Sequence, residues 1–129
     1  MKRRLLLAGA LLLAAGAALA QGSSRPLKIV VPFGTGTSTD IVGRILADAL
    51  GRQLGVAAIV ENKPGAGGAI GSEQVARATD GQTLLMGTVG THAINPSLYK
   101  RLAYQPLRDF VPLGFVGATP TLLVVPANS

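Results

Sequence analysis

Apolar residues recur in this 129-residue chain with two alternating spacings. Short apolar runs at Leu27–Phe33, Ala57–Glu61 and Thr83–Gly87 are typical of buried strands. After the first run, apolar residues return at intervals of three and four, as along one face of a helix: Ile41, Val42, Ile45, Leu46, Ala49, Leu50 and Leu54. Because strands and helices alternate at the spacing of βαβ units, the sequence predicts an α/β fold with a parallel sheet.

The helix after the first strand has a start signal and a stop signal. Thr37 and Asp40 have the spacing of a capping box, with Thr37 as the N-cap and Asp40 at position N3. Gly55 is expected to end the helix. Charged residues on its polar face are spaced to pair one turn apart: Arg44, Asp48 and Arg52.

The other expected elements are shorter. A helix of mostly small residues is predicted at Ala69–Ala78, and a helical turn at Ser97–Arg101. Two further strands are predicted at Leu113–Ala118 and Leu122–Val125, where apolar residues are again consecutive.

Residues 1–20 have the features of a secretory signal peptide. Three basic residues are followed by an apolar stretch, Leu5–Ala17, that is short for a membrane span, and then by the small-x-small sequence Ala18-Leu19-Ala20. We therefore predict cleavage after Ala20 and a periplasmic mature chain. An uncleaved membrane anchor is the alternative.

Composition disfavours several classes of function. The leader holds three of the 12 basic residues, which leaves nine against six acidic residues and a net charge of +3. These charges are scattered, without basic runs or interleaved aromatic residues, so no nucleic-acid partner is expected. The lack of cysteine removes disulfides, thiolate metal sites and cysteine nucleophiles, and a lone histidine disfavours a metal site. We expect neither a metal nor a cofactor.

The glycine-rich stretch Asn62–Gly71 is the most informative motif. It joins a strand to a helix, an arrangement that aims backbone N–H groups at an anion. A second such turn, Pro32–Asp40, lies one strand and one helix earlier. Ligands of parallel sheets bind beyond the carboxyl ends of the strands. The loops expected at that edge are Gly34–Thr39, Lys63–Gly68 and Thr88–Asn95, which predicts a small anion held by backbone groups.

Other interpretations of these loops are weaker. A dinucleotide fingerprint would need glycine where Ile70 stands, and a carboxylate about 20 residues further on, where Met86–Val89 has none. Tight turns and close helix–sheet packing would also explain the glycines. Ser38 and Ser72 lie outside a nucleophile-elbow motif, which disfavours a serine nucleophile. An exported α/β enzyme that uses Ser38 or His92 is nevertheless kept as an alternative. For His92, ligand contact and loop support are both open.

Five motifs occur in an order that resembles the Bug family, the periplasmic substrate-binding proteins of tripartite tricarboxylate transporters. The motifs that carry this resemblance are Ile29-Val30-Val31-Pro32-Phe33, Ser38-Thr39-Asp40, Val60-Glu61-Asn62-Lys63-Pro64-Gly65-Ala66-Gly67-Gly68, Asp80-Gly81-Gln82-Thr83-Leu84-Leu85-Met86-Gly87 and Asn95-Pro96-Ser97-Leu98-Tyr99.

The resemblance implies a lobe of a periplasmic binding protein-like fold, with a parallel sheet between two helical layers. It implies capture of a small carboxylate for membrane permease subunits, a hinge motion that buries the ligand, and no catalysis. The implied ligand-binding residues are Phe33, Gly34, Thr35, Gly36, Ser38, Thr39, Gly65, Ala66, Gly67, Gly68, Thr88 and His92.

The sequence departs from the family pattern in two ways. Thr35-Gly36-Thr37 stands where the family usually has Pro-Gly-Gly, and threonine takes positive φ less readily than glycine. We also expect residues 21–118 to form an incomplete first lobe and residues 119–129 to start a crossover toward a missing second lobe. Exposed apolar edges and marginal stability would follow. A non-functional truncated fragment is therefore a further alternative.

Overall fold

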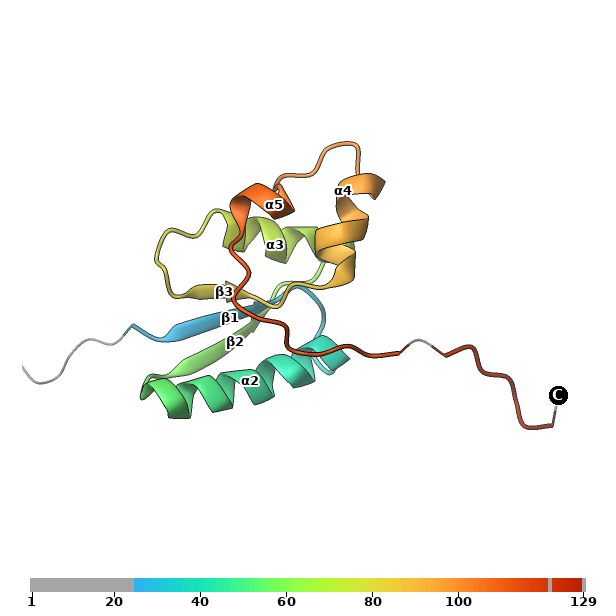
Figure 1. The fold of residues 1–129 in the computed structure, drawn as a ribbon, viewed down its shortest axis with the longest axis horizontal. Helices are drawn as coiled ribbons and strands as arrows, with labels where there is room; N and C mark the ends of the chain where they lie inside the picture. The colour runs from blue at the N-terminus through green and yellow to red at the C-terminus, as the bar shows by residue number, and fades with distance from the viewer. Residues whose placement is uncertain (1–24, 121, 129) are drawn as a thin grey trace, which may run out of the picture.

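A computed structural model of the protein describes residues 25–120 and 122–128, and its centre is a three-stranded parallel sheet. The strands are β1 (Leu27–Val31), β2 (Ala58–Asn62) and β3 (Thr83–Leu85), in the order β2-β1-β3 (Figure 1). In the register of the sheet, Ile29 of β1 lies beside Val60 on one side and Leu84 on the other. The predicted α/β class and parallel sheet are confirmed.

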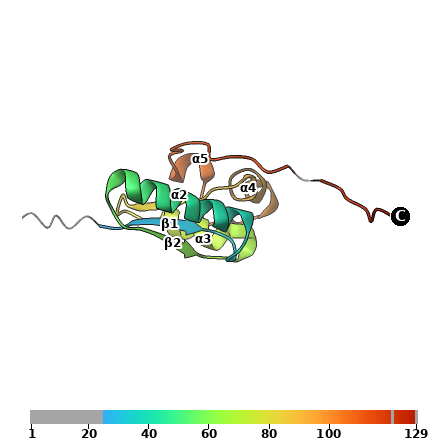
Figure 2. The same cartoon turned by 90° about the horizontal axis from the view of Figure 1, so that it is seen from below.

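Helices cover both faces of the sheet. The long helix α2 (Ser38–Leu54) lies on one face, and α3 (Ala69–Ala76) lies on the other (Figures 1 and 2). The face of α3 also carries α5 (Pro106–Asp109) and a continuous helical stretch made of η2 (Gly90–Ile94) and α4 (Asn95–Leu98). The result is the predicted three-layer arrangement.

The core lies between α2 and the central strand. It consists of Ile29, Val31, Ala47 and Met86, each no more than 9% exposed. Because β1 has a neighbour on each side and helices over both faces, its residues are buried, apart from the half-buried Lys28. A Cβ atom at Gly43 of α2 would lie 3.0 Å from Val31 Cγ2, so this glycine allows the helix to approach the strand closely.

The ends of α2 follow the sequence signals. The N–H of Asp40 donates to Thr37 Oγ1 at 3.3 Å, and Gly55 ends the helix with φ 66°. Thr37 itself has φ −71° and ψ 160°, while Gly36 takes the positive φ of this loop, +83°. The replacement of glycine by Thr37 is therefore accommodated without left-handed backbone.

Three sequence expectations are wrong. Arg44 pairs with Asp40, one turn earlier, and Asp48 forms no ion pair within the described residues. Helical structure after β3 begins at Gly90 and ends at Leu98, earlier than the predicted turn at Ser97–Arg101.

The third wrong expectation concerns the two last strands. Within the described residues, neither Leu113–Ala118 nor Leu122–Val125 pairs in the sheet. Apolar runs favour the strand conformation, but a strand also needs a hydrogen-bonded neighbour. The segment instead extends away from the body (Figure 1) and exposes 87% of Phe115 and 99% of Leu123.

A buried tyrosine attaches the segment after α4 to the body of the protein. Tyr104 is only 2% exposed, and its hydroxyl donates to the carbonyl of Thr91 at 2.6 Å. Its ring contacts Phe110 edge-on, with the ring centroids 5.7 Å apart. This contact could not be predicted from local sequence signals, because Tyr104 lies in a short proline-containing connection.

The predicted signal peptide lies outside the described residues. Among residues 25–120 and 122–128, none of the helices combines the length and the apolar character that crossing a membrane requires.

The packing of β1 predicts a large loss of stability on truncation of its central side chain. Ile29→Ala should lower the free energy of unfolding by about 2–5 kcal/mol, because Ile29 is 1% exposed and part of the core. Ile45→Ala is the matched control, since Ile45 is 64% exposed, and should cost about 0.5 kcal/mol or less. Urea unfolding followed by circular dichroism measures both. Equal losses would contradict this location of the core.

Candidate functional site

The loops that follow the three strands meet at Gly68. A Cβ atom there would lie 2.7 Å from Thr91 Cγ2, in the third loop, and 3.3 Å from Phe33 Cζ, in the first. Gly71 is equally close to its surroundings, since its Cβ would lie 3.0 Å from Pro32 Cα. The structure therefore brings the three predicted loops together at the carboxyl edge of the sheet. Whether the predicted residues bind a ligand stays a prediction.

The second loop has four consecutive residues with positive φ. Gly65, Ala66, Gly67 and Gly68 have φ of 130°, 47°, 60° and 86°, and Ala66 is the one non-glycine residue with positive φ in the described chain. Such a conformation costs an alanine about 1–2 kcal/mol, and strained backbone of this kind gathers at ligand-binding turns. Helix α3 starts directly afterwards, and no side chain caps its first turn. Its N-terminus faces the loop with the polarity that attracts an anion.

Buried side chains hold the carbonyl groups of this turn. Asn95 Nδ2 donates to the carbonyl of Gly67 at 3.0 Å, and Ser72 Oγ donates to that of Gly68 at 2.9 Å. Ser72 is fully buried and Asn95 is 3% exposed. These bonds fix the orientation of the two peptide planes. Ser72 therefore has a structural role here, in agreement with its position outside a nucleophile motif.

The first loop is held by contacts with its neighbours. Thr37 Oγ1 donates to the carbonyl of Gly34 at 2.8 Å, and the N–H of Gly36 donates to Asp40 Oδ2 at 2.8 Å. The second bond replaces the expected return contact of the capping box, in which Asp40 would accept from Thr37. Among the predicted site residues of this loop, three are exposed (Thr35, Gly36 and Ser38) and three are half-buried (Phe33, Gly34 and Thr39).

Asp40 is the most heavily bonded carboxylate in this region. It is 2% exposed, and it accepts from Gly36, from Arg44 and from Asn62 Nδ2, the last at 2.9 Å. The hydrogen bond from Arg44, followed by those from Gly36 and Asn62, lowers the pKa of Asp40 from 3.8 to about 2. Sequence analysis treated Asp40 as a cap and did not identify Asn62. The signal available was an asparagine at the end of a strand, directly before the glycine turn.

The third loop is built around Thr88 and Thr91. The N–H of Thr88 donates to Thr91 Oγ1 at 2.9 Å, and Thr91 is fully buried. His92 Nδ1 lies 2.8 Å from the same hydroxyl, and its ring packs against Phe110 with centroids 5.0 Å apart. Burial lowers the pKa of His92 below its usual 6.5, which favours the neutral ring. These contacts support the loop-support interpretation of His92, and ligand contact stays a prediction.

Cations beside the loops are already paired with carboxylates. Arg44 Nη2 lies 3.0 Å from Asp40 Oδ1, and Lys63 Nζ lies 2.7 Å from Glu61 Oε1. The hydrogen bond with Lys63, the larger contribution, and that with Lys28 lower the pKa of Glu61. An anion at this edge would therefore meet mainly backbone N–H groups and hydroxyls.

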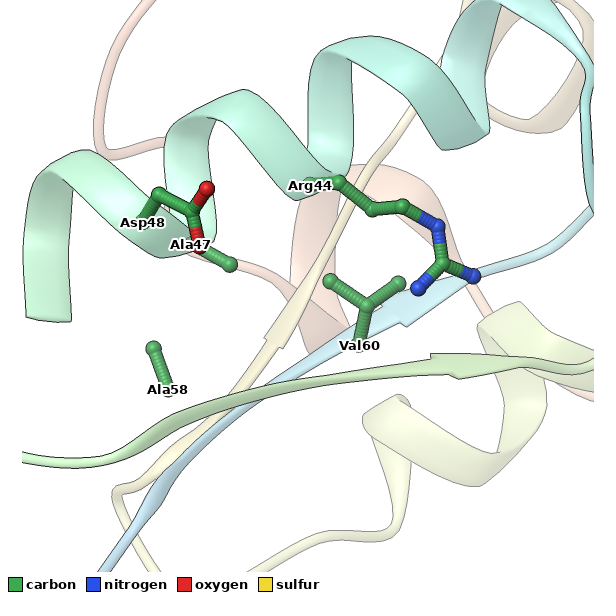
Figure 3. Close-up of a pocket in the computed structure, with 5 residues that line it drawn as sticks. All are labelled: Arg44, Ala47, Asp48, Ala58 and Val60. Atoms are coloured by element: carbon green, nitrogen blue, oxygen red, sulfur yellow. The ribbon is translucent and has the colours of Figure 1, made fainter.

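A hollow of about 240 Å³ lies away from these loops, between α2 and β2 (Figure 3). It is lined by small or apolar side chains and by two charged ones: Arg44, Ala47, Asp48, Ala58 and Val60. Two of these residues, Ala47 of α2 and Ala58 of β2, have short side chains that leave space between the helix and the strand. None of the predicted site residues lines it.

The described residues do not assemble a metal site or a serine–histidine pair. Within residues 25–120 and 122–128, no group of three or more histidine, aspartate or glutamate side chains is placed to hold a metal ion. Ser38 makes no hydrogen bond with His92 in this part of the chain, where the ring nitrogen contacts Thr91 instead.

The close contacts of Gly68 predict a strong effect of adding one methyl group. Gly68→Ala should lower the free energy of unfolding by roughly 2–5 kcal/mol, because φ is +86° and the new Cβ would lie 2.7 Å from Thr91. Gly34→Ala is the control, since a Cβ there meets nothing within 4 Å, and should cost less than about 1 kcal/mol. Chemical denaturation measures both. A well-tolerated Gly68→Ala would contradict the meeting of the loops.

The bonds to Asp40 predict a specific loss of stability in acid. Because its folded-state pKa of about 2 lies below 3.8, its contribution is complete above pH 3.8 and is lost as the pH falls toward 2. Asp40→Asn should therefore show a smaller fall in unfolding free energy across this interval than the unsubstituted protein. Asp48→Asn, at a carboxylate without an ion pair in the described structure, should follow the unsubstituted protein. Parallel curves for Asp40→Asn would contradict the assignment.

Comparisons with known proteins match most of the chain. The sequence model described as "Tripartite tricarboxylate transporter family receptor" matches residues 42–129. The chain is 41% identical over 107 residues to the UPF0065 protein in the tcbD-tcbE intergenic region of Pseudomonas sp. strain P51, covering 82% of this chain and 32% of that protein. It is 42% identical over 103 residues to BugT of Bordetella pertussis, covering 78% and 32%.

Solved structures agree with the sequence relatives. MatC from Rhodopseudomonas palustris with bound malate superposes with a TM-score of 0.67 at 40% identity, covering 70% of this chain and 31% of that one. The periplasmic binding protein BugD superposes with a TM-score of 0.63 at 44% identity, covering 70% and 30%. The chain spans about a third of the length of the curated relatives it matches. It belongs to the tripartite tricarboxylate transporter receptor family, as the resemblance to the Bug proteins predicted.

Proposed function

We propose that this chain forms the lobe of a solute receptor that first receives a small carboxylate, at the carboxyl edge of its sheet. The observation that carries the proposal is the meeting of three strand-to-helix loops at Gly68. The second of these loops has consecutive positive φ values and leads into a helix without a side-chain cap.

The chemistry of this edge suits a carboxylate better than a cation or an apolar ligand. The N-terminus of α3 supplies partial positive charge and N–H donors. Exposed hydroxyls on the first loop, at Thr35 and Ser38, can donate further hydrogen bonds. Because Arg44 and Lys63 already pair with carboxylates, neutral donors would do most of the binding.

Relatives of the chain support this choice of ligand class. MatC was solved with malate, and another R. palustris protein was solved with adipate and superposes with a TM-score of 0.63 at 34% identity. Both ligands are dicarboxylates of small size. The proposal assigns binding and no catalytic step, because the matched family consists of receptors.

The proposal includes a place for the protein in transport. Residues 1–20 would direct export to the periplasm, residues 21–118 would form the first lobe, and residues 119–129 would start the crossover to a second lobe. Closure of two lobes would bury the carboxylate before its delivery to membrane permease subunits.

Titration calorimetry of the full chain with malate and with adipate tests the proposal. Thr35→Val should weaken binding by about threefold to tenfold, because it removes one hydrogen bond from the Thr35 hydroxyl to the ligand. Thr79→Val, the same change at an exposed threonine beyond the far end of the sheet, should leave the affinity unchanged. Raising the ionic strength should change the affinity little, because neutral donors are weakly screened.

Two results would contradict the proposal. The first is no heat of binding with either dicarboxylate at millimolar concentration. The second is equal weakening by Thr35→Val and Thr79→Val, which would exclude the first loop as a source of donors.

A further inference from the structure

Residues 33–37, the part of the first loop region that precedes α2, are held at both ends by side chains from outside this stretch. Asn62 Nδ2 donates to the carbonyl of Phe33 at 3.1 Å. Asp40 Oδ2 accepts from the N–H of Gly36 at 2.8 Å. The short stretch between these two points therefore depends on the positions of Asn62, at the end of β2, and Asp40, in the first turn of α2.

One arginine holds both of these side chains. Arg44 Nε donates to Asp40 Oδ2 at 3.1 Å, and Arg44 Nη2 lies 3.0 Å from Asp40 Oδ1. The same Nη2 donates to Asn62 Oδ1 at 3.0 Å. Asn62 Nδ2 in turn donates to Asp40 Oδ1 at 2.9 Å, so the three side chains form a closed set of contacts.

We propose that Asp40, Arg44 and Asn62 form a loop clamp, which sets the conformation of residues 33–37 and thereby the affinity of the site for its carboxylate. The clamp residues are positioning residues, which act on the ligand through the loop. The link to affinity rests on the proposed function, and the link to loop conformation does not.

Two features of the clamp distinguish it from an ordinary surface ion pair. Asp40 is 2% exposed, so water competes little for its bonds, whereas surface pairs are largely solvated. Arg44 reaches three acceptor atoms from a planar fork, a geometry that the single ammonium of lysine does not provide. The clamp therefore requires an arginine and not simply a positive charge.

The clamp is tested with Arg44→Met, which removes the guanidinium and keeps much of the apolar stem. In the full chain, hydrogen exchange of the Gly36 amide should accelerate about tenfold or more. The dissociation constant for malate should rise by a similar factor, which corresponds to the loss of one charge-assisted hydrogen bond. Arg44→Lys should show most of both effects, because it keeps the charge and loses the fork.

Arg77→Met is the matched control. Arg77, directly after the last residue of α3, also pairs with an acid one turn earlier, Glu73. The Arg77 side chain is largely exposed. Arg77→Met should leave both Gly36 exchange and malate affinity unchanged. Urea unfolding of each variant shows how much stability is lost, so a general loosening would appear equally at amides remote from the loop, such as Gly55.

Different results would overturn different parts of the proposal. Unchanged Gly36 exchange in Arg44→Met would show that the clamp does not set the loop conformation. Faster exchange with unchanged malate affinity would show that the loop conformation does not determine binding. Full rescue by Arg44→Lys would contradict the requirement for a fork. If the unsubstituted chain does not bind malate, the proposed function and the link to affinity both fail, while Gly36 exchange still decides the link to loop conformation.

Discussion

The parallel pairing of β1 with both of its neighbours is the constraint on which the rest of the structure depends. Parallel strands end at the same edge of a sheet, so the turns after β1, β2 and β3 are necessarily neighbours. Glycine at position 68 then allows the turns to touch, because any side chain there would collide with Thr91 and approach Phe33. Loops separated by up to about 60 residues in the sequence thus form one surface.

The fold could largely be predicted because its signals are local. The apolar runs of the first three strands, the Thr37 cap and the Gly55 stop each act within a few residues, and they appear in the structure. Long-range contacts could not be predicted in this way. Arg44 pairs with Asp40 and not with Asp48, and both Arg44 and Asp40 also bond to Asn62, at the end of β2 and 18 positions beyond Arg44. The apolar runs after residue 112 lack a neighbouring strand in the described structure, a condition that their own residues do not determine.

Charge is arranged so that the loop edge is polar but nearly neutral. Asp40 neutralises the charge of Arg44, and Glu61 neutralises that of Lys63. The cations closest to the loops therefore bind carboxylates of the protein itself. What stays directed toward a ligand is backbone polarity from the glycine turn and the start of α3. Such dipoles are fixed by the fold and need little reorganisation on binding, which makes the conformation of the loops the main determinant of affinity.

The central claim is that the glycine turn and the first loop together receive a carboxylate. Mapping of backbone amide resonances during titration with malate tests it most directly. The account predicts that the amides of Gly36, Gly67 and Gly68 shift in a saturable manner, while those of Gly55 and Gly81, at other turns, do not. Saturable shifts confined to Ala47 and Val60, in the hollow between α2 and β2, or no shifts at all would contradict it.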